Sequence, residues 1–118
     1  MAQSSAMELV QAAKANITEI TASQAKTLFK AGSIPLDVRE SAEYAAGHIT
    51  NARHISRGML EFQIANQPDF ENKDASIVVY CKSGGRSALA TQTLQQLGFT
   101  NVQSLQGGYD GWDHNSII

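Results

Sequence analysis

The amino-acid sequence predicts an α/β domain in which a parallel sheet is covered by helices on both faces. Segments rich in β-branched residues alternate with segments of helical periodicity along the 118 residues, and this alternation is typical of parallel βαβ units. Residues 76–80 (SIVVY) are apolar without alternation, as expected for a strand buried on both faces. The length fits one domain, which we place at residues 17–116 after a partly helical N-terminal lead at residues 1–16.

The first half of the chain alternates strands and helices. Short β-branched or apolar runs predict strands at residues 16–21, 34–39 and 49–56, of which the last is the weakest. The spacing of apolar residues and stop signals predicts helices at residues 21–33 and 40–48. Thr21 can cap the first of these helices, because Gln24 stands three residues on. Gly32 and Gly47 end the two helices.

The second half repeats the pattern. A helix is predicted at residues 57–67, and a polar loop with a proline follows at residues 66–75. After the buried strand at residues 76–80, apolar spacing predicts a helix at residues 86–98 in which Gly98 is the C′ residue. The last strand is predicted at residues 99–105, and a turn is predicted at residues 106–112 (QGGYDGW). The methionines are expected to fill the core.

The only cysteine of the chain, Cys81, comes directly after the most buried strand. In parallel α/β sheets, ligands bind beyond the carboxyl ends of the strands. A lone cysteine in an apolar setting is most often a small core residue. Here charge, a serine, two glycines and an arginine follow it at a strand-to-helix junction. This context favours a functional thiol.

The loop after the strand can stabilise an anion. Its residues are Cys81, Lys82, Ser83, Gly84, Gly85 and Arg86. The two glycines allow the backbone to curl so that successive N–H groups turn inward, and the next helix adds its N-terminal N–H groups. Lys82 and Arg86 add positive charge. These features lower the pKa of a cysteine and favour its thiolate, which is the nucleophilic form.

Composition excludes several other classes of protein. The net charge of −2 and the pI near 5.8 give no support to nucleic-acid or membrane-surface binding. No apolar stretch reaches the ~20 residues that span a bilayer. One cysteine excludes an internal disulfide, and His48, His54 and His114 lack the spacing of a metal site, so no cofactor is expected. The N-terminal segment lacks the basic start and long apolar stretch of a secretory signal, and the single cysteine fits a reducing compartment, so we expect a cytoplasmic protein.

Four segments in register resemble the rhodanese family of sulfurtransferases. They are LDVRESAEYAAGHI (residues 36–49), RGMLEF (57–62), VVYCKSGGRSALA (78–90) and LGFTNVQSLQGGYDGW (97–112). The resemblance covers roughly residues 17–112 and implies a five-stranded parallel sheet flanked by helices. Departures from the family pattern stand at Thr50, Asn51 and Ser56, where Pro-Gly and Pro are common. These positions lie outside the loop after Cys81.

The resemblance also implies a mechanism. Cys81 matches the family's nucleophile, which takes the outer sulfur of a donor such as thiosulfate, becomes a persulfide and passes the sulfur to cyanide or a thiol. Residues 82–86 match the cradle, and Arg86 matches a basic position that can pair with a sulfonate. The partners implied are a small sulfur donor and a cyanide or thiol acceptor, including a protein thiol. We expect a monomer.

Other charged and aromatic residues are interpreted as structural. Arg39 is expected to pair with a carboxylate, and Asp37 to accept from backbone donors near the strand end. Glu43 is likewise interpreted as a structural residue and not as a catalytic one. His48 is expected to orient a helix end, and Tyr109 and Trp112 to pack in the core and close the rim. Arg53 and Arg57 either lie near the mouth or belong to a solvated face, which is the default interpretation for such charges.

Two rival functions use similar residues. Cysteine-dependent phosphatases and arsenate reductases also hold a thiolate in an anion cradle, but their pattern resembles Cys-x5-Arg, one residue longer than the stretch from Cys81 to Arg86. A non-catalytic rhodanese-like interaction module commonly lacks the cysteine, which this chain keeps. The sequence therefore favours sulfur transfer.

Overall fold

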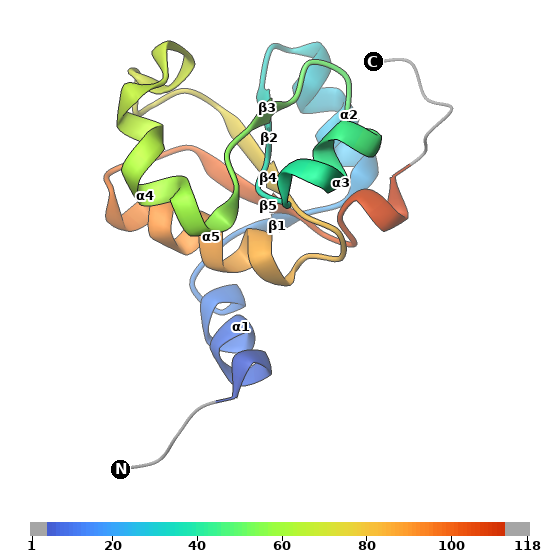
Figure 1. Cartoon of the computed structure of the whole chain (residues 1–118), viewed down its shortest axis with the longest axis vertical. Helices are drawn as coiled ribbons and strands as arrows, with labels where there is room; N and C mark the ends of the chain where they lie inside the picture. The colour runs from blue at the N-terminus through green and yellow to red at the C-terminus, as the bar shows by residue number, and fades with distance from the viewer. Residues whose placement is uncertain (1–4, 113–118) are drawn as a thin grey trace.

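The computed structural model describes residues 5–112, which form a single parallel sheet covered by helices (Figure 1). The strands are β1 (Glu19–Ile20), β2 (Ile34–Asp37), β3 (Arg53–His54), β4 (Ile77–Tyr80) and β5 (Val102–Leu105). Their order in the sheet is β1-β5-β4-β2-β3, and all neighbours pair in parallel. The predicted fold class and its five parallel strands are confirmed.

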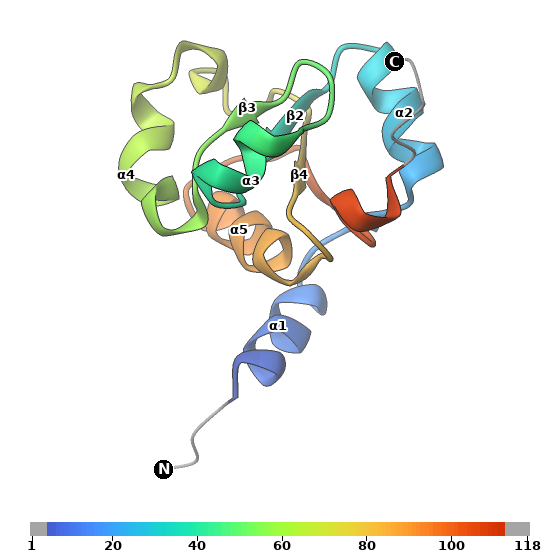
Figure 2. The same ribbon diagram turned by 45° about the vertical axis from the view of Figure 1, so that its right-hand side comes forward.

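Helices cover both faces of the sheet. The α-helices within the described residues are α1 (Ala6–Lys14), α2 (Ala22–Lys30), α3 (Ser41–Ala46), α4 (Leu60–Gln63) and α5 (Gly85–Gln96). Short 3-10 turns are η1 (Arg57–Met59), η2 (Ile64–Asn66), η3 (Pro68–Phe70) and η4 (Tyr109–Gly111). In Figure 2, α4 and α5 lie on one side of the sheet, and α2 and η4 lie on the other.

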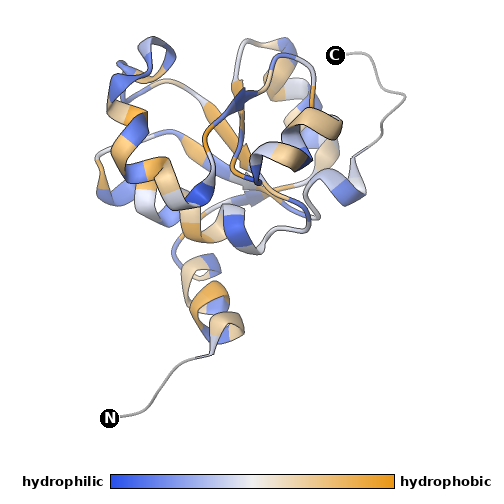
Figure 3. Cartoon of the chain, in the orientation of Figure 1, coloured by the Kyte–Doolittle hydropathy of each residue, from blue (hydrophilic) through white to orange (hydrophobic). Residues whose placement is uncertain are grey.

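The central strand β4 divides the core into two clusters. Its side chains alternate, so Ile77, Val79 and Cys81 join the cluster beneath α4 and α5, while Val78 and Tyr80 join the cluster beneath α2. All of them are at most 1 % exposed. Figure 3 shows the hydrophobic colour concentrated on the central strands. The alternation therefore places the thiol on the α5 face of the sheet.

Local signals account for the helix starts. Thr21 caps α2 as predicted, because its Oγ1 accepts from the N–H of Gln24 at 3.2 Å, while the Thr21 N–H donates to Gln24 Oε1 at 2.8 Å. Ser5 caps α1 in the same way through Glu8.

The helix α1 packs against α5 and otherwise projects from the domain (Figure 1). The domain start at residue 17 stays a prediction.

Several predicted boundaries are wrong. Strands were predicted at residues 16–21 and 49–56, but β1 and β3 have only two residues each. Both are edge strands that pair with a neighbour on one side only. The helix predicted at residues 57–67 is broken into η1, α4 and η2, and the loop at residues 66–75 contains η3.

The methionines were expected in the core, but Met7 and Met59 are 65 % and 45 % exposed and do not fill it. No helix within residues 5–112 is long and apolar enough to cross a membrane.

Candidate active site

The thiol of Cys81 lies where β4 turns into α5. Residues 82–84 make the turn, and Gly84 is the N-cap of α5 with a φ of 116°. This left-handed conformation is strained for any residue with a Cβ, which explains a glycine here. Gly85 and Arg86 are the first residues of α5. The helix therefore begins one residue earlier than predicted, and Arg86 belongs to its first turn and not to the loop.

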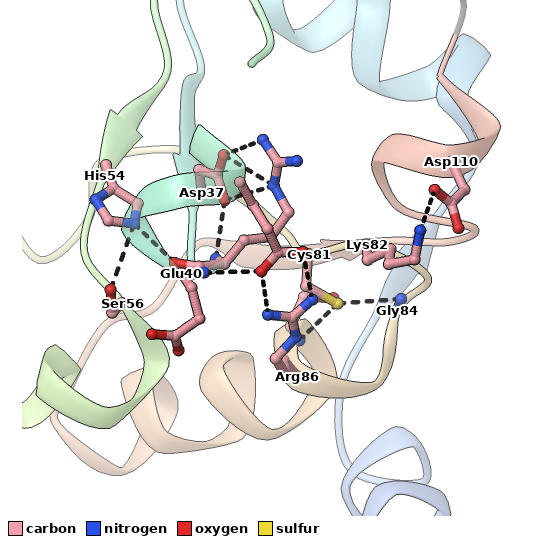
Figure 4. A network of polar contacts seen from close by, with 12 residues as sticks. Asp37, Glu40, His54, Ser56, Cys81, Lys82, Gly84, Arg86 and Asp110 are labelled. Carbon is pink, nitrogen blue, oxygen red and sulfur yellow. Dashed lines mark hydrogen bonds and ion pairs between the residues drawn. The ribbon is translucent and has the colours of Figure 1, made fainter. Parts of the chain in front are cut away.

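Donors of the turn and helix converge on the sulfur. The Gly84 N–H donates to Cys81 Sγ at 3.1 Å, and the Ser87 N–H donates to it at 3.3 Å. The Ser87 hydroxyl lies 3.5 Å from the same sulfur. Cys81 is 1 % exposed and Ser87 is fully buried. Figure 4 shows the sulfur facing the turn at Gly84. N–H groups of the turn and of the helix start therefore face the thiol, as the glycine-rich loop predicted.

These donors shift the ionisation of the thiol. Burial alone raises the pKa of Cys81, because it removes water from the charged form. The Ser87 hydroxyl and the N–H groups of Ser87, Gly84 and Ser83 act in the opposite direction and outweigh burial, so the pKa is lowered. The sequence interpretation missed Ser87. Its only signal is its place in the first helical turn after the loop.

A second turn holds the loop from behind. The Tyr109 N–H donates to the Cys81 carbonyl at 2.8 Å, and the Asp110 N–H donates to the Lys82 carbonyl at 3.0 Å. Gly108 has a φ of 57°, and a Cβ placed on it would lie 2.6 Å from the Cys81 carbonyl oxygen. These bonds fix the carbonyl groups of Cys81 and Lys82 against the second turn. The predicted turn at residues 106–112 thus supports the site directly.

The two cations of the loop region are paired with carboxylates. Lys82 Nζ lies 3.2 Å from Asp110, and the lysine side chain is 62 % exposed and turned toward that carboxylate (Figure 4). Arg86 forms a two-pronged pair with Glu43 of α3 at 2.8 and 3.2 Å. Neither side chain donates a hydrogen bond to Cys81 among the described contacts. The positive charges of Lys82 and Arg86 were expected beside the thiol, but both side chains bind carboxylates and do not contact the sulfur.

A buried ion pair frames the neighbouring strand. Arg39 pairs with Asp37 at 2.7 Å and donates to the Gly47 carbonyl at the end of α3, also at 2.7 Å. The Arg39 backbone N–H donates to Asp37 at 2.9 Å. The guanidinium lies 4.4 Å from the centroid of the Tyr109 ring. The structural roles predicted for Asp37 and Arg39 are confirmed, and the pair links β2 to α3 and η4.

The remaining candidates stay outside the sulfur cradle. His48 Nδ1 lies 2.9 Å from the Tyr44 carbonyl near the end of α3, as predicted for a residue that orients a helix end. Arg53 and Arg57 are paired with Asp69 and Glu61. His114 lies outside the described residues. Within residues 5–112, no group of three His, Cys, Asp or Glu side chains could hold a metal ion.

Fold and site together define an α/β protein with a buried cysteine in a ring of N–H donors at a strand-to-helix junction. The family model for the rhodanese-like domain matches residues 21–115. The chain therefore belongs to the rhodanese family. The prediction of a rhodanese-type enzyme is confirmed by this match and by curated relatives that are named sulfurtransferases.

Relatives cover most of the chain. Thiosulfate sulfurtransferase GlpE of Pseudomonas fluorescens is 36 % identical over 75 % of this chain and 77 % of its own length. The chloroplastic thiosulfate sulfurtransferase 16 of Arabidopsis thaliana is 34 % identical over 85 % of this chain and 90 % of its own. Among solved structures, a protein of unknown function from Rhodopseudomonas palustris, described as a possible tyrosine phosphatase, has a TM-score of 0.83 at 32 % identity. The matched region covers 95 % of this chain and 93 % of the chain in that solved structure.

Proposed function

We propose that the protein is a sulfurtransferase that carries a sulfane sulfur on Cys81. The observation that supports this most is the convergence of neutral donors on one buried sulfur, with Gly84 N–H and Ser87 N–H at 3.1 and 3.3 Å. Such a ring stabilises an anion on sulfur, both before the attack and on the leaving cysteine thiolate. The proposed activity agrees with the names of the curated relatives, which are thiosulfate sulfurtransferases.

The proposed cycle has two balanced steps. The Cys81 thiolate attacks the outer sulfur of thiosulfate, the S–S bond of the donor breaks, and sulfite leaves with the electron pair. The product is a Cys81 persulfide anion. Cyanide or a thiolate then attacks the outer sulfur, the Cys81–sulfur bond breaks, and the cysteine returns as a thiolate with thiocyanate or a new persulfide released.

The acceptor must come from outside the chain. Cys81 is the only cysteine, so no second thiol of the protein can take the sulfur. A small thiol or a cysteine of another protein is the cellular acceptor that we propose. We also propose that the protein works as a monomer in a reducing compartment such as the cytoplasm, where its thiol stays reduced.

Phosphate chemistry is a weaker candidate. It is favoured by the similarity to the structure described as a possible tyrosine phosphatase. The stretch from Cys81 to Arg86 is one residue shorter than Cys-x5-Arg, and the Arg86 guanidinium is held by Glu43. A tetrahedral phosphate needs a wider ring with more donors than a terminal sulfur does. A purely non-catalytic module would have no need for the thiol and its cradle.

Intact mass spectrometry tests the proposal. Incubation with thiosulfate should add one sulfur atom to the protein, and cyanide should remove it with release of thiocyanate. Cys81→Ala should show neither adduct nor turnover, and the wild type should not hydrolyse aryl phosphates measurably. Thiocyanate release by the Cys81→Ala variant, or efficient aryl phosphate hydrolysis by the wild type without a sulfur adduct, would overturn the proposal.

A further inference from the structure

A pair of buried hydroxyls lies behind the sulfur. Ser87 of α5 and Ser104 of β5 are both 0 % exposed, and their Oγ atoms are 2.8 Å apart. Ser104 follows Val102 on the same face of β5, and its strand partner is Val79. A hydroxyl in such an apolar position costs free energy unless it is hydrogen-bonded. Among residues 5–112, Ser87 is the hydrogen-bond partner of the Ser104 hydroxyl, and Ser87 Oγ in turn lies 3.5 Å from Cys81 Sγ.

Counting the protons shows which state of the sulfur fits this pair. Beside a thiolate, Ser104 donates to Ser87 and Ser87 donates to Cys81, so both hydroxyl protons are used. Beside a thiol that donates to Ser87, the order of donors reverses, and the Ser104 proton has no acceptor among residues 5–112. A buried donor without an acceptor is costly. The pair is therefore complementary to the thiolate.

We infer that Ser104 is a positioning residue that acts through Ser87 and favours the thiolate of Cys81 in sulfur transfer. Its hydroxyl sets the direction in which the Ser87 O–H points, and aligned hydrogen bonds strengthen one another in a low-dielectric interior. The same alignment assists the second step of the proposed cycle, because Cys81 leaves there as a thiolate. The role of Ser104 in sulfur transfer rests on the proposed function. Its effect on the ionisation of Cys81 does not, because that ionisation can be measured without any sulfur donor.

The experiment measures the ionisation of the single thiol. Iodoacetamide alkylation is followed against pH for wild type, Ser104→Ala, Ser87→Ala and the double variant, with Ser33→Ala as the control. Ser33 forms a similar hydroxyl pair with Ser76 at 2.5 Å, and both residues directly precede β2 and β4 at the opposite end of the strands from Cys81. Urea unfolding and circular dichroism establish that each variant is folded during the titration.

Ser104→Ala should raise the pKa of Cys81 and slow alkylation below that pKa by about three- to tenfold, as expected for the loss of a hydrogen bond in a charged network. The effect should vanish in the Ser87→Ala background, and Ser33→Ala should titrate as wild type. Ser104→Thr, which keeps the hydroxyl, should also titrate as wild type and remains informative if Ser104→Ala does not fold.

Two results would overturn the inference. The first is a Ser104→Ala variant that loses stability but titrates as wild type, which would make the pair only a structural contact. The second is a shift in pKa that persists without Ser87, or that Ser104→Thr reproduces, because the effect would then not pass through the hydroxyls. A failure of sulfur transfer by the wild type would contradict the proposed function and leave the titration result unaffected.

Discussion

The sulfur of Cys81 has two kinds of neighbour, and they differ in burial and in charge. The neutral cradle, which comprises the N–H groups of Gly84 and Ser87 and the Ser87 hydroxyl, is buried and lies within 3.5 Å of the sulfur. The charged flank comprises Lys82 and Arg86, whose side chains are 62 % and 35 % exposed and paired with carboxylates. Hydrogen bonds are worth most where water is excluded. We therefore assign stabilisation of the thiolate chiefly to the cradle and not to the formal charges of the flank.

The largest expected effect comes from disturbing the backbone behind the cradle. In Gly108→Ala, the new Cβ would lie 2.6 Å from the carbonyl oxygens of Cys81 and Lys82, and the φ of 57° is unfavourable for alanine. Urea denaturation should show a loss of about 3 kcal/mol in the free energy of unfolding, together with slower alkylation of Cys81. Gly111→Ala is the matched control, because its Cβ would meet no atom within 4 Å. Equal stability of the two variants would contradict this account of the turn.

The next effect separates the two roles open to Arg86. If its guanidinium binds the donor's sulfonate, Arg86→Ala should lower kcat/KM for thiosulfate by roughly ten- to a hundredfold. Glu43→Gln frees the same guanidinium and should keep kcat/KM near the wild-type value. Both variants should lose only about 1 kcal/mol of stability, because the pair is about one-third exposed. Equal losses of activity in the two variants would make the pair structural only.

A smaller effect follows from the ionisation of Glu43. The hydrogen bond from Arg86, followed by that from the Glu40 N–H, lowers the pKa of Glu43 from 4.5 to about 2. A carboxyl with a lowered pKa stabilises the fold above its unfolded value, so this stabilisation is present above about pH 4.5 and is lost as the pH falls toward 2. The stability difference between wild type and Glu43→Gln should therefore shrink between pH 6 and pH 3 in urea unfolding. A difference that stays constant over this range would refute the assignment.

The contrast between cradle and flank also explains what the sequence could reveal. The buried run at residues 76–80 and the capping box at Thr21 are local patterns, and both predicted their elements. The glycine turn after Cys81 likewise predicted inward N–H groups. The partners of the flank were not predictable from local pattern, because Glu43 and Asp110 lie 43 and 28 residues from Arg86 and Lys82 along the chain. Ser104 gave only the weak signal of a polar residue in an apolar strand.

The smallest effect is expected at Lys82, although it is the cation next to the nucleophile in sequence. Its partner Asp110 is 54 % exposed, and exposed pairs of this kind contribute little. Lys82→Ala should therefore change the free energy of unfolding by less than about 0.5 kcal/mol and should leave the pH dependence of Cys81 alkylation close to wild type. The loop should keep its shape, because the Asp110 N–H holds the Lys82 carbonyl and does not depend on the side chain. Lys82→Met is the matched variant that keeps the aliphatic stem without the charge. If either variant slowed alkylation as strongly as is expected for Ser104→Ala, formal charge and not the neutral cradle would set the reactivity of the thiol, and the division of roles proposed above would fail.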